Sequence, residues 1–358
     1  MVRDLKPTDL SIGAFSDDQL DRVQRAYGLE SAMVLPFFAL NDSITDLRRR
    51  TETARKAFIE TERGVLFLKE LPWYCASVEF ARFQSELLTG LGAEGAAVAA
   101  PLPTRSGEGF FHDRVTGSLF LLQPYLEGRS WVGGVGQARS AGRALAALHH
   151  CGSRVTIAPY PGMTDVFDSA AALISLLLDG WAGSDSAVGE VTSLATSALA
   201  AVEQCRAEAY AVGYGSVAVP VHGDFNPFNV VFGASSDSVV GVVDFDKACL
   251  DDPAHDLGEA LVRFGWIKYR GFSSVYGAVP SEFDLAATSA VVSGYRDYSE
   301  ATANAARQFL PAVMTVVALE LAAIGLLASY YDADDLPALR RNVSTLLPMA
   351  SDAIAAIW

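Results

Sequence analysis

The sequence is poor in cysteine, and the spacing of its cysteines excludes two common kinds of site. Four occur in 358 residues and none forms a C-x-x-C pair; they are Cys75, Cys151, Cys205 and Cys249. A structural zinc site needs clustered ligands, and a disulfide framework is typical of small secreted chains. We therefore expect four free thiols. The first residues also lack the apolar run of a signal peptide, so we expect a cytoplasmic protein.

Basic residues are scarce as well. The chain has 27 Lys and Arg against 42 Asp and Glu, a formal net charge of −15. Binding to nucleic acid or to an anionic membrane surface needs basic patches, so this balance argues against both partners. A cationic ligand would be compatible with it, but solubility alone accounts for it. With 51% hydrophobic residues over 358 positions, the chain can form two domains or one large bilobal domain.

Long hydrophobic runs are also rare, and one stretch needs a membrane check. Residues Phe309 to Tyr331 are mostly apolar and nearly long enough to span a bilayer. The stretch carries Pro311 near its start and Glu320 in its middle, however, and an acidic residue at the centre of a spanning helix costs about 2.5 to 3.5 kcal/mol. We therefore expect a buried helix of a large domain and no membrane partner.

Two familiar phosphate-binding motifs are missing. The sequence has no Walker A motif, G-x-x-x-x-G-K-[ST], and no G-x-G-x-x-G loop in its first sixty residues. Glycines 133–136 and 213–215 form short clusters, but neither cluster follows a strand and opens a helix, as a dinucleotide site requires. If the protein binds a nucleotide, we expect the phosphates to be covered by the Ser-, Thr- and Arg-containing stretch between Asn41 and Thr53.

The order of periodic segments predicts two lobes of different composition. Strand-like runs at 56–60 and 65–71 flank a turn at 61–64, and a helix is expected at 78–91. A further strand pair is expected around 107–109, ending at 118–123. Beyond that point Ala- and Leu-rich helices are expected at 137–150, 169–178 and 193–211, with a β insertion at 217–243. We place the small β-rich lobe at 1–123 and the larger helical lobe at 124–358.

The strongest chemical signal lies in the β insertion. A strand leads into His222-Gly-Asp224, and Asn229 follows five residues after the aspartate. A second apolar strand then ends in Asp244-Phe-Asp246. Phosphoryl transfer requires magnesium held against the phosphates and a carboxylate positioned at the attacking hydroxyl. Magnesium prefers oxygen ligands, which Asn and Asp side chains on adjacent loops can supply.

The order H-x-D-x-x-x-x-N followed by D-F-x resembles the catalytic and metal-binding loops of the protein-kinase superfamily. The glycine after His222 and the downstream Asp256 resemble its aminoglycoside phosphotransferase branch, which includes homoserine and choline kinases. This resemblance, from about residue 65 to 261, implies a bilobal kinase-like α+β fold. It also implies that Asp224 is the catalytic base, and that Asn229 and Asp244 bind magnesium. His222 would orient the catalytic loop, and Asp256 would brace it.

The resemblance also implies nucleotide-binding residues in the first lobe. Lys69, near the end of a strand, is similar to the family's phosphate-binding lysine, and Glu86 on the next helix to its glutamate partner. Glu79 lies on the same helical face and is the alternative. Gln123 to Tyr125 occupy the position of the adenine-binding hinge. For Asp246, a second metal-facing carboxylate and a solvated residue both remain open.

Together these features predict a phosphotransferase that uses ATP, with GTP as the alternative, and Mg²⁺ to phosphorylate a hydroxyl of a small molecule. An antibiotic or related natural product is the first expected acceptor, and homoserine, an amino alcohol or a sugar is the alternative. A catalytically idle binding module is the third reading. The acceptor site is expected in the helical lobe, where two groups could line it: Asp251, Asp252, Asp332, Asp334 and Asp335, or Trp181, Trp266, Tyr269, Tyr295 and Tyr298. The oligomeric state is not predicted.

Overall fold

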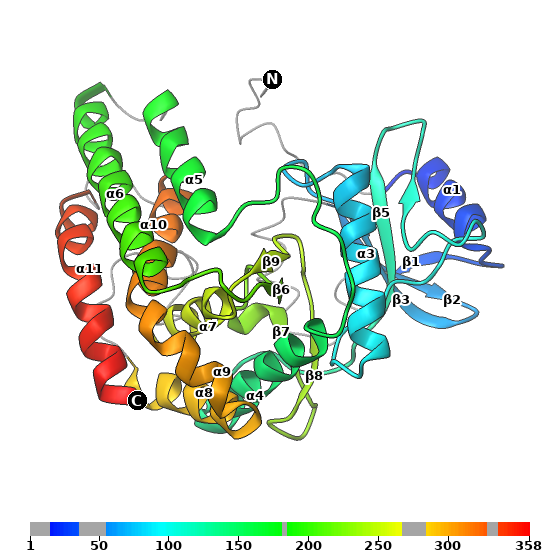
Figure 1. Cartoon of the computed structure of the whole chain (residues 1–358). Coiled ribbons are helices and arrows are strands. Elements are labelled where there is room, and N and C mark those ends of the chain that lie inside the picture. The colour runs from blue at the N-terminus through cyan, green and yellow to red at the C-terminus, as the bar shows by residue number, and fades with distance from the viewer. Residues whose placement is uncertain (1–14, 36–54, 181–184, 267–283, 328–335) are drawn as a thin grey trace. The chain divides into compact units, whose positions relative to one another are not determined.

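A computed structural model describes residues 15–35, 55–180, 185–266, 284–327 and 336–358 (Figure 1). The chain divides into two compact units. Unit 1 consists of Met1–Trp131, Cys151–Pro161 and Phe228–Lys247, and unit 2 of Val132–His150, Gly162–Pro227 and Ala248–Trp358. The predicted domains, 1–123 and 124–358, divide the chain once, whereas three separate segments make up each unit.

Unit 1 is built on a five-stranded antiparallel sheet with the order β1-β2-β3-β5-β4. Its core joins the sheet to helix α1 (Asp17–Tyr27), and the side chains that meet there are almost fully buried, among them Val23, Tyr27, Ile59, Leu68 and Phe120. The strands are β1 (Met33–Leu35), β2 (Lys56–Thr61), β3 (Gly64–Glu70), β4 (Phe111–His112) and β5 (Leu119–Pro124).

The two predicted strand pairs of this unit have different outcomes. The hairpin β2–β3 forms with its turn at the predicted position, where the Thr61 hydroxyl donates to the Gly64 carbonyl over 2.9 Å. The strand pair predicted around residues 107–109 is wrong, because the turn at residues 104–108 has no paired strands beside it, β4 begins only at Phe111 and the chain reverses between β4 and β5 at residues 113–118. The Asp113 carboxylate stabilises this later turn by accepting from the Thr116 hydroxyl and the Val115 amide.

Helix α3 (Val78–Ala93) follows β3 and confirms the helix predicted at 78–91. Ser77 begins it, with its hydroxyl accepting from the Phe80 amide over 3.0 Å, a normal N-cap arrangement. One face of the helix is buried and carries Phe80, Phe83, Gln84, Leu87 and Leu91. The opposite face, with Glu79 and Glu86, is exposed.

Unit 2 is mostly helical, as predicted, and the expected helices at 137–150, 169–178 and 193–211 lie inside its longer helices. Helix α10 is its central element, packed against α5, α6, α7 and α11 (Figure 1). The helices of the unit are α4 (Val135–Gly152), α5 (Val166–Gly180), α6 (Asp185–Ala211), α7 (Ala254–Leu261), α8 (Leu285–Tyr298), α9 (Glu300–Ala306), α10 (Leu310–Leu327) and α11 (Leu336–Ile357).

Helix α10 contains most of the predicted apolar run. Among the described residues, the segment Glu300–Leu327 is the one helical stretch long and apolar enough to cross a membrane, but 78% of its most apolar window is buried inside the structure. Glu320 lies in this helix, buried, with the Ser169 hydroxyl of α5 at 3.5 Å from its carboxylate. The burial of this helix agrees with the core role predicted for it.

Two glycines allow α4 and α8 to cross at close range. A Cβ atom on Gly142 would lie 2.0 Å from the Val291 carbonyl oxygen, and one on Gly294 would lie 1.9 Å from the Arg139 carbonyl oxygen. Each helix thus fits its backbone against a glycine of the other. Larger side chains at either position would force the helices apart.

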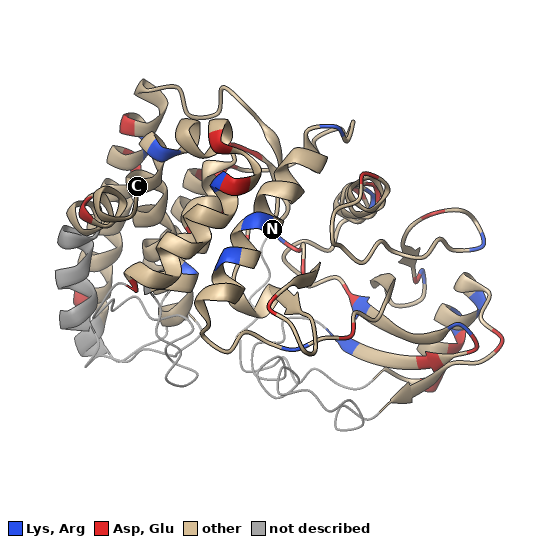
Figure 2. Cartoon of the chain, turned by 90° about the horizontal axis from the view of Figure 1, so that it is seen from below, with Lys and Arg blue, Asp and Glu red and all other residues tan. Residues whose placement is uncertain are grey.

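The β insertion forms two short antiparallel pairs. In unit 2, β6 (Val219–Val221) pairs with β9 (Cys249–Asp251), and in unit 1, β7 (Val230–Phe232) pairs with β8 (Val239–Val242). The motif from His222 to Asn229 lies in the connection between β6 and β7, and residues 244–246 lie in the connection between β8 and β9. In Figure 2 the acidic and basic residues are distributed over many elements of both units and do not gather on one of them.

Candidate active site

Asp244 stands at the end of β8 in an unusual backbone conformation. Its φ of 71° makes it the one non-glycine residue with a positive φ in the described part of the chain. Such a conformation costs free energy in most residues, and Asp and Asn tolerate it best. Strained backbone of this kind is concentrated at functional sites. This conformation turns the chain after β8 and fixes the direction in which the Asp244 side chain extends.

Asn229 is brought to the same end of the β7–β8 pair. It closes a short 3₁₀ turn, Pro227–Asn229, immediately before β7, and its carbonyl accepts from the Val243 amide over 2.9 Å. Asn229 and the residue before Asp244 are therefore bonded directly through their backbones. The pair offers a carboxylate and an amide oxygen, the hard donors that Mg²⁺ prefers, so the residues present fit the predicted metal.

Two lysines from neighbouring strands face Asp244. Lys56 of β2 and Lys69 of β3 are direct cross-strand partners. Like charges in such positions repel each other, and the carboxylate of Asp244 offsets the repulsion. Lys69 pairs closely with Asp244, and the Lys56 Nζ lies 3.4 Å from its other oxygen. Burial alone would raise the pKa of Asp244, but the charges of Lys56 and Lys69 hold it well below its ordinary value.

Lys69 is buried in a cage of two carboxylates. Its Nζ also lies 2.6 Å from Asp246, and only 4% of its side chain is exposed. Burial would lower the pKa of Lys69, but the charges of Asp244 and Asp246 raise it above its ordinary value. Burial and the charge of Asp244 together raise the pKa of Asp246. Lys69 is therefore a charged, fixed ammonium next to the candidate metal ligands.

The predicted partner of Lys69 is wrong. Glu86 is exposed on α3, and the ammonium of Lys69 pairs with Asp244 and Asp246 instead. The residue of α3 that reaches this cluster is Gln84, whose side-chain amide donates to Asp246 over 3.2 Å. The reason lies in helix phase, because positions 84 and 86 point about 200° apart on a helix of 3.6 residues per turn. The alternative, Glu79, is exposed as well.

Asp224, the predicted base, lies in unit 2 and has a charged partner that the sequence did not reveal. The Arg263 guanidinium donates to its carboxylate over 2.8 Å. Arg263 is 5% exposed and also lies 3.5 Å from Glu259, one turn earlier. The side chain of Asp224 is 26% exposed, so one of its faces can meet solvent or a ligand.

The loop before Asp224 is built on Asp256, as the resemblance implies. The buried carboxylate of Asp256 accepts from the backbone amides of His222 over 2.7 Å and Gly223 over 2.8 Å. Gly223 has a φ of 73°, which a glycine adopts without strain. His222 then accepts from the Asp224 amide through Nδ1 over 3.1 Å. These bonds hold the backbone that carries Asp224.

Buried groups of α4 and α8 support Asp256. His149 of α4 lies 3.0 Å from its carboxylate through Nε2 and 2.7 Å from the Tyr295 hydroxyl through Nδ1. Burial would raise the pKa of Asp256, but the hydrogen bond and charge of His149, with the neighbouring imidazoles, lower it to about 2. Tyr295 is fully buried and is therefore a core residue here.

The predicted hinge residues lie at the end of β5. The Gln123 side chain donates to the Ala99 carbonyl over 2.6 Å, and the Tyr125 amide lies 3.3 Å from the Val65 carbonyl. The ring of Tyr125 meets Phe58 edge-on with centroids 5.2 Å apart. Both side chains thus stabilise the end of the strand, and adenine binding by this segment stays a prediction.

The acidic acceptor residues that the structure describes serve the fold. Asp251 accepts from the amides of Val166 and Asp252 and pairs with His255, and Asp252 accepts from the Ala254 amide. Both carboxylates are buried, which contradicts a role in lining an open acceptor site. The other candidates, Asp332, Asp334, Asp335, Trp181 and Tyr269, and the stretch between Asn41 and Thr53, lie outside the described residues.

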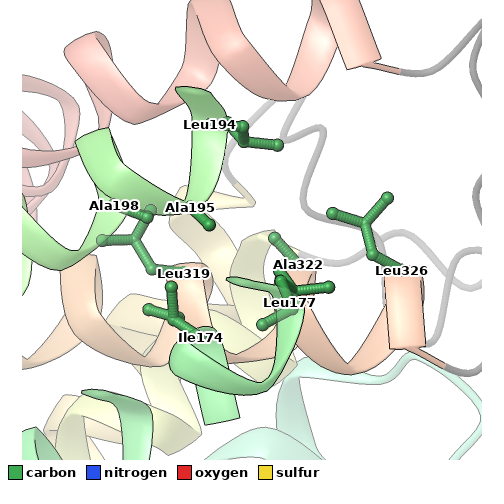
Figure 3. A pocket seen from close by; sticks show the side chains of 9 residues that line it. Ile174, Leu177, Leu194, Ala195, Ala198, Leu319, Ala322 and Leu326 are labelled. Atoms are coloured by element: carbon green, nitrogen blue, oxygen red, sulfur yellow. The ribbon is translucent and has the colours of Figure 1, made fainter. Parts of the chain in front are cut away.

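Sequence reasoning missed Lys56, Gln84 and Arg263. Arg263 could have been found, because it lies seven residues after Asp256 and four after Glu259, on one face of a continuing helix. Lys56 could be found only from the register of β2 on β3, which places it beside Lys69. A separate pocket between α5, α6 and α10 is lined only by aliphatic side chains, including Ile174 and Leu319, so it offers no group for phosphate or metal (Figure 3).

The sequence of this chain is similar to those of a known family and of a curated relative. Residues 47–281, more than half of the chain, match the phosphotransferase enzyme family. A homoserine kinase from Methylobacterium nodulans is 30% identical over 176 residues, which are 49% of this chain and 50% of that protein. The match thus spans about half the length of this curated relative.

Solved structures share the fold. An amicoumacin kinase, solved with AMP-PNP and Ca²⁺, has a TM-score of 0.61 and 17% identity over 94% of each chain. A microcompartment-associated aminopropanol kinase has a TM-score of 0.60 and 15% identity over 96% of this chain and 98% of that one. These likenesses confirm the predicted kinase-like α+β fold. With the family match over residues 47–281, they lead to one conclusion: the chain belongs to the phosphotransferase enzyme family.

Proposed function

We propose that this protein uses a magnesium-bound nucleotide, ATP before GTP, to phosphorylate a hydroxyl group of a small molecule. The observation that carries the proposal is the strained Asp244, bonded through its neighbour to Asn229 and faced by Lys56 and Lys69. Two oxygen donors beside two ammonium groups match the charges of a nucleotide polyphosphate with its metal. The family membership supports the same chemistry.

Each residue has a distinct role in this reaction. Asp244 and Asn229 would hold Mg²⁺, which neutralises charge on the phosphate oxygens when bound. Lys69 would contact the phosphates, with Lys56 adding positive charge. Asp224 would orient the acceptor hydroxyl and take its proton, and Arg263 would keep the carboxylate of Asp224 in one direction. The backbone amides tied to Asp256 would keep that loop rigid.

For the acceptor, we place a small hydroxylated amine or amino acid first. The curated relative at 30% identity is a homoserine kinase, whereas the amicoumacin kinase shares the fold at 17% identity. This reverses the order expected from the sequence, in which an antibiotic came first. An antibiotic or another natural product remains the second candidate, with a role in resistance or self-protection. An idle binding module is disfavoured, because Lys69, Asp224, Asn229 and Asp244 are all present.

A transfer assay tests the proposal. The purified protein would be incubated with Mg²⁺ and γ-labelled ATP or GTP against homoserine, amino alcohols, sugars, aminoglycosides and other antibiotics. We expect label on one compound class with the natural chain, and transfer reduced by about 100-fold or more with Asp224→Asn. Transfer that persists at the natural rate in Asp224→Asn would contradict the role of Asp224. A protein that binds neither MgATP nor MgGTP would overturn the proposed function as a whole.

A further inference from the structure

Lys69 has two acidic partners, and their surroundings differ. The side chain of Asp244 is 29% exposed, whereas that of Asp246 is 8% exposed. The carboxylate of Asp244 extends from a strained backbone position next to Asn229, where a metal ion can reach it. The side chain of Asp246 lies instead against the buried face of α3. The two carboxylates are therefore suited to different tasks.

We propose that Asp246, held by Gln84, is the permanent ionic partner of Lys69 and keeps this lysine positioned for the nucleotide when Asp244 turns to the metal. The inference rests on the proposed function and goes beyond it by assigning roles to two residues. Asp246 is then neither a solvated residue nor primarily a metal ligand. It is a positioning residue that acts through Lys69.

The geometry of one oxygen supports this assignment. Oδ1 of Asp246 lies 2.6 Å from the Lys69 Nζ and 3.2 Å from the Gln84 Nε2. The same oxygen thus receives two donors, one from β3 and one from α3, and this fixes its direction. Gln84 is 1% exposed and Lys69 is 3% exposed, so water does not compete for either contact. A buried ammonium without such a partner would be strongly destabilised.

Charge balance explains why the lysine needs this second carboxylate. In the structure, Lys56 and Lys69 both pair with Asp244. Without Asp246, the single charge of Asp244 would have to balance two ammonium groups. A divalent cation bound at Asp244 and Asn229 would compete with both lysines for the same carboxylate. Asp246 then remains to balance Lys69 within the buried cluster. Without it, the buried ammonium of Lys69 would lose the contact that holds it in position.

Gln84 also indicates how the assignment can be tested. Its Oε1 is buried and has no hydrogen-bond partner among the described residues. A glutamate at this position would place a carboxylate on the same buried face of α3, close to the Lys69 cluster. The acidic partner of Lys69 can therefore be moved from position 246 to position 84 by two substitutions that each exchange an amide and a carboxylate.

The experiment is a double-mutant cycle with Asp246→Asn, Gln84→Glu and the combined variant. MgATP affinity, its Mg²⁺ midpoint and the thermal midpoint would be measured for each, with Glu60→Gln as a matched control on the exposed face of β2. We expect Asp246→Asn to weaken MgATP binding by about 30-fold or more, as loss of one partner of a buried charge pair does. The combined variant should recover most of this loss, although Gln84→Glu alone weakens binding.

Each other result is decisive. If the combined variant binds MgATP as weakly as Asp246→Asn, and the Mg²⁺ midpoint rises in both, Asp246 is a metal ligand and the inference is wrong. If Asp246→Asn lowers only the thermal midpoint and leaves MgATP affinity unchanged, its role is structural and the positioning role is wrong. Failure of the natural chain to bind any nucleotide would instead overturn the proposed function, and this inference with it.

Discussion

At the scale of single residues, the site depends on Asp244 more than on any other side chain. Its carboxylate faces Lys56 and Lys69, and its φ of 71° is one that Asp and Asn adopt most easily among residues with a side chain. Its charge and its backbone conformation can therefore be separated experimentally. Asn at this position keeps the conformation and removes the charge, whereas Val would strain the backbone too.

We predict that Asp244→Asn lowers MgATP affinity and turnover by about 100-fold or more while the protein stays folded. Stability should fall as well, because the lost carboxylate no longer offsets the repulsion between Lys56 and Lys69, although Lys69 keeps Asp246 as its partner. Nucleotide titration and thermal unfolding of the same preparation check both parts. Unchanged MgATP affinity in Asp244→Asn would exclude this residue as a metal ligand.

Arg263 offers a second prediction at this scale. Its guanidinium contacts Asp224 over 2.8 Å from a buried position. Arg263→Ala should lower turnover by about 10- to 100-fold, since a misplaced reacting group costs this much. MgATP affinity should change far less, and Arg263→Lys should restore part of the turnover. An equal loss of affinity and turnover would contradict a role through Asp224.

At the scale of elements, the loop that leads from β6 to Asp224 is held by Asp256. Its pKa of about 2 lies below the ordinary value, so its ionised form stabilises the fold. This contribution, about 2 kcal/mol, is complete above about pH 4 and is lost as the pH falls towards 2. Urea unfolding from pH 6 to pH 2 should show the natural chain and Asp256→Asn converging at the acid end. A constant difference over that range would contradict it.

The crossing of α4 and α8 gives another prediction for elements. Gly142→Ala should destabilise the protein by about 1 to 3 kcal/mol, because the new Cβ would lie 2.0 Å from the Val291 carbonyl oxygen. Gly189→Ala in α6 is the matched control, because no atom in the described part of the chain lies within 4 Å of its Cβ position. The control should be neutral or slightly stabilising, as alanine favours helix. Equal effects of the two substitutions on stability would mean that α4 and α8 can move apart without loss of free energy.

At the scale of the whole molecule, the sequence predicted what depends on local pattern. The hairpin β2–β3 and helix α3 were predictable because periodicity and turn residues are local signals. The kinase-like α+β fold was predictable because the motifs resemble those of a known superfamily. Asp224, Asn229 and Asp244 stood out through their spacing after apolar strands. The bracing role of Asp256 was predicted from the resemblance to the aminoglycoside phosphotransferase branch.

Features that depend on pairing between distant segments were not predictable. The partner of Lys69 required the phase of α3, and Lys56 required the register of β2 on β3. Arg263 meets Asp224 across 39 positions of sequence. Asp251 and Asp252 suggested an acceptor site as a charge cluster, but they bind backbone amides instead. Spacing along the chain does not reveal which carboxylates are used up by the fold.

The most direct test of the central claim is a paired measurement on Asp224→Asn, with MgATP binding and γ-phosphate transfer followed on the same sample. The claim predicts that transfer to the hydroxyl acceptor falls by about 100-fold or more while MgATP affinity stays within about threefold of the natural chain. Transfer that continues at the natural rate would contradict Asp224 as the catalytic base. Loss of MgATP binding in step with transfer would contradict the separation of metal binding from proton transfer.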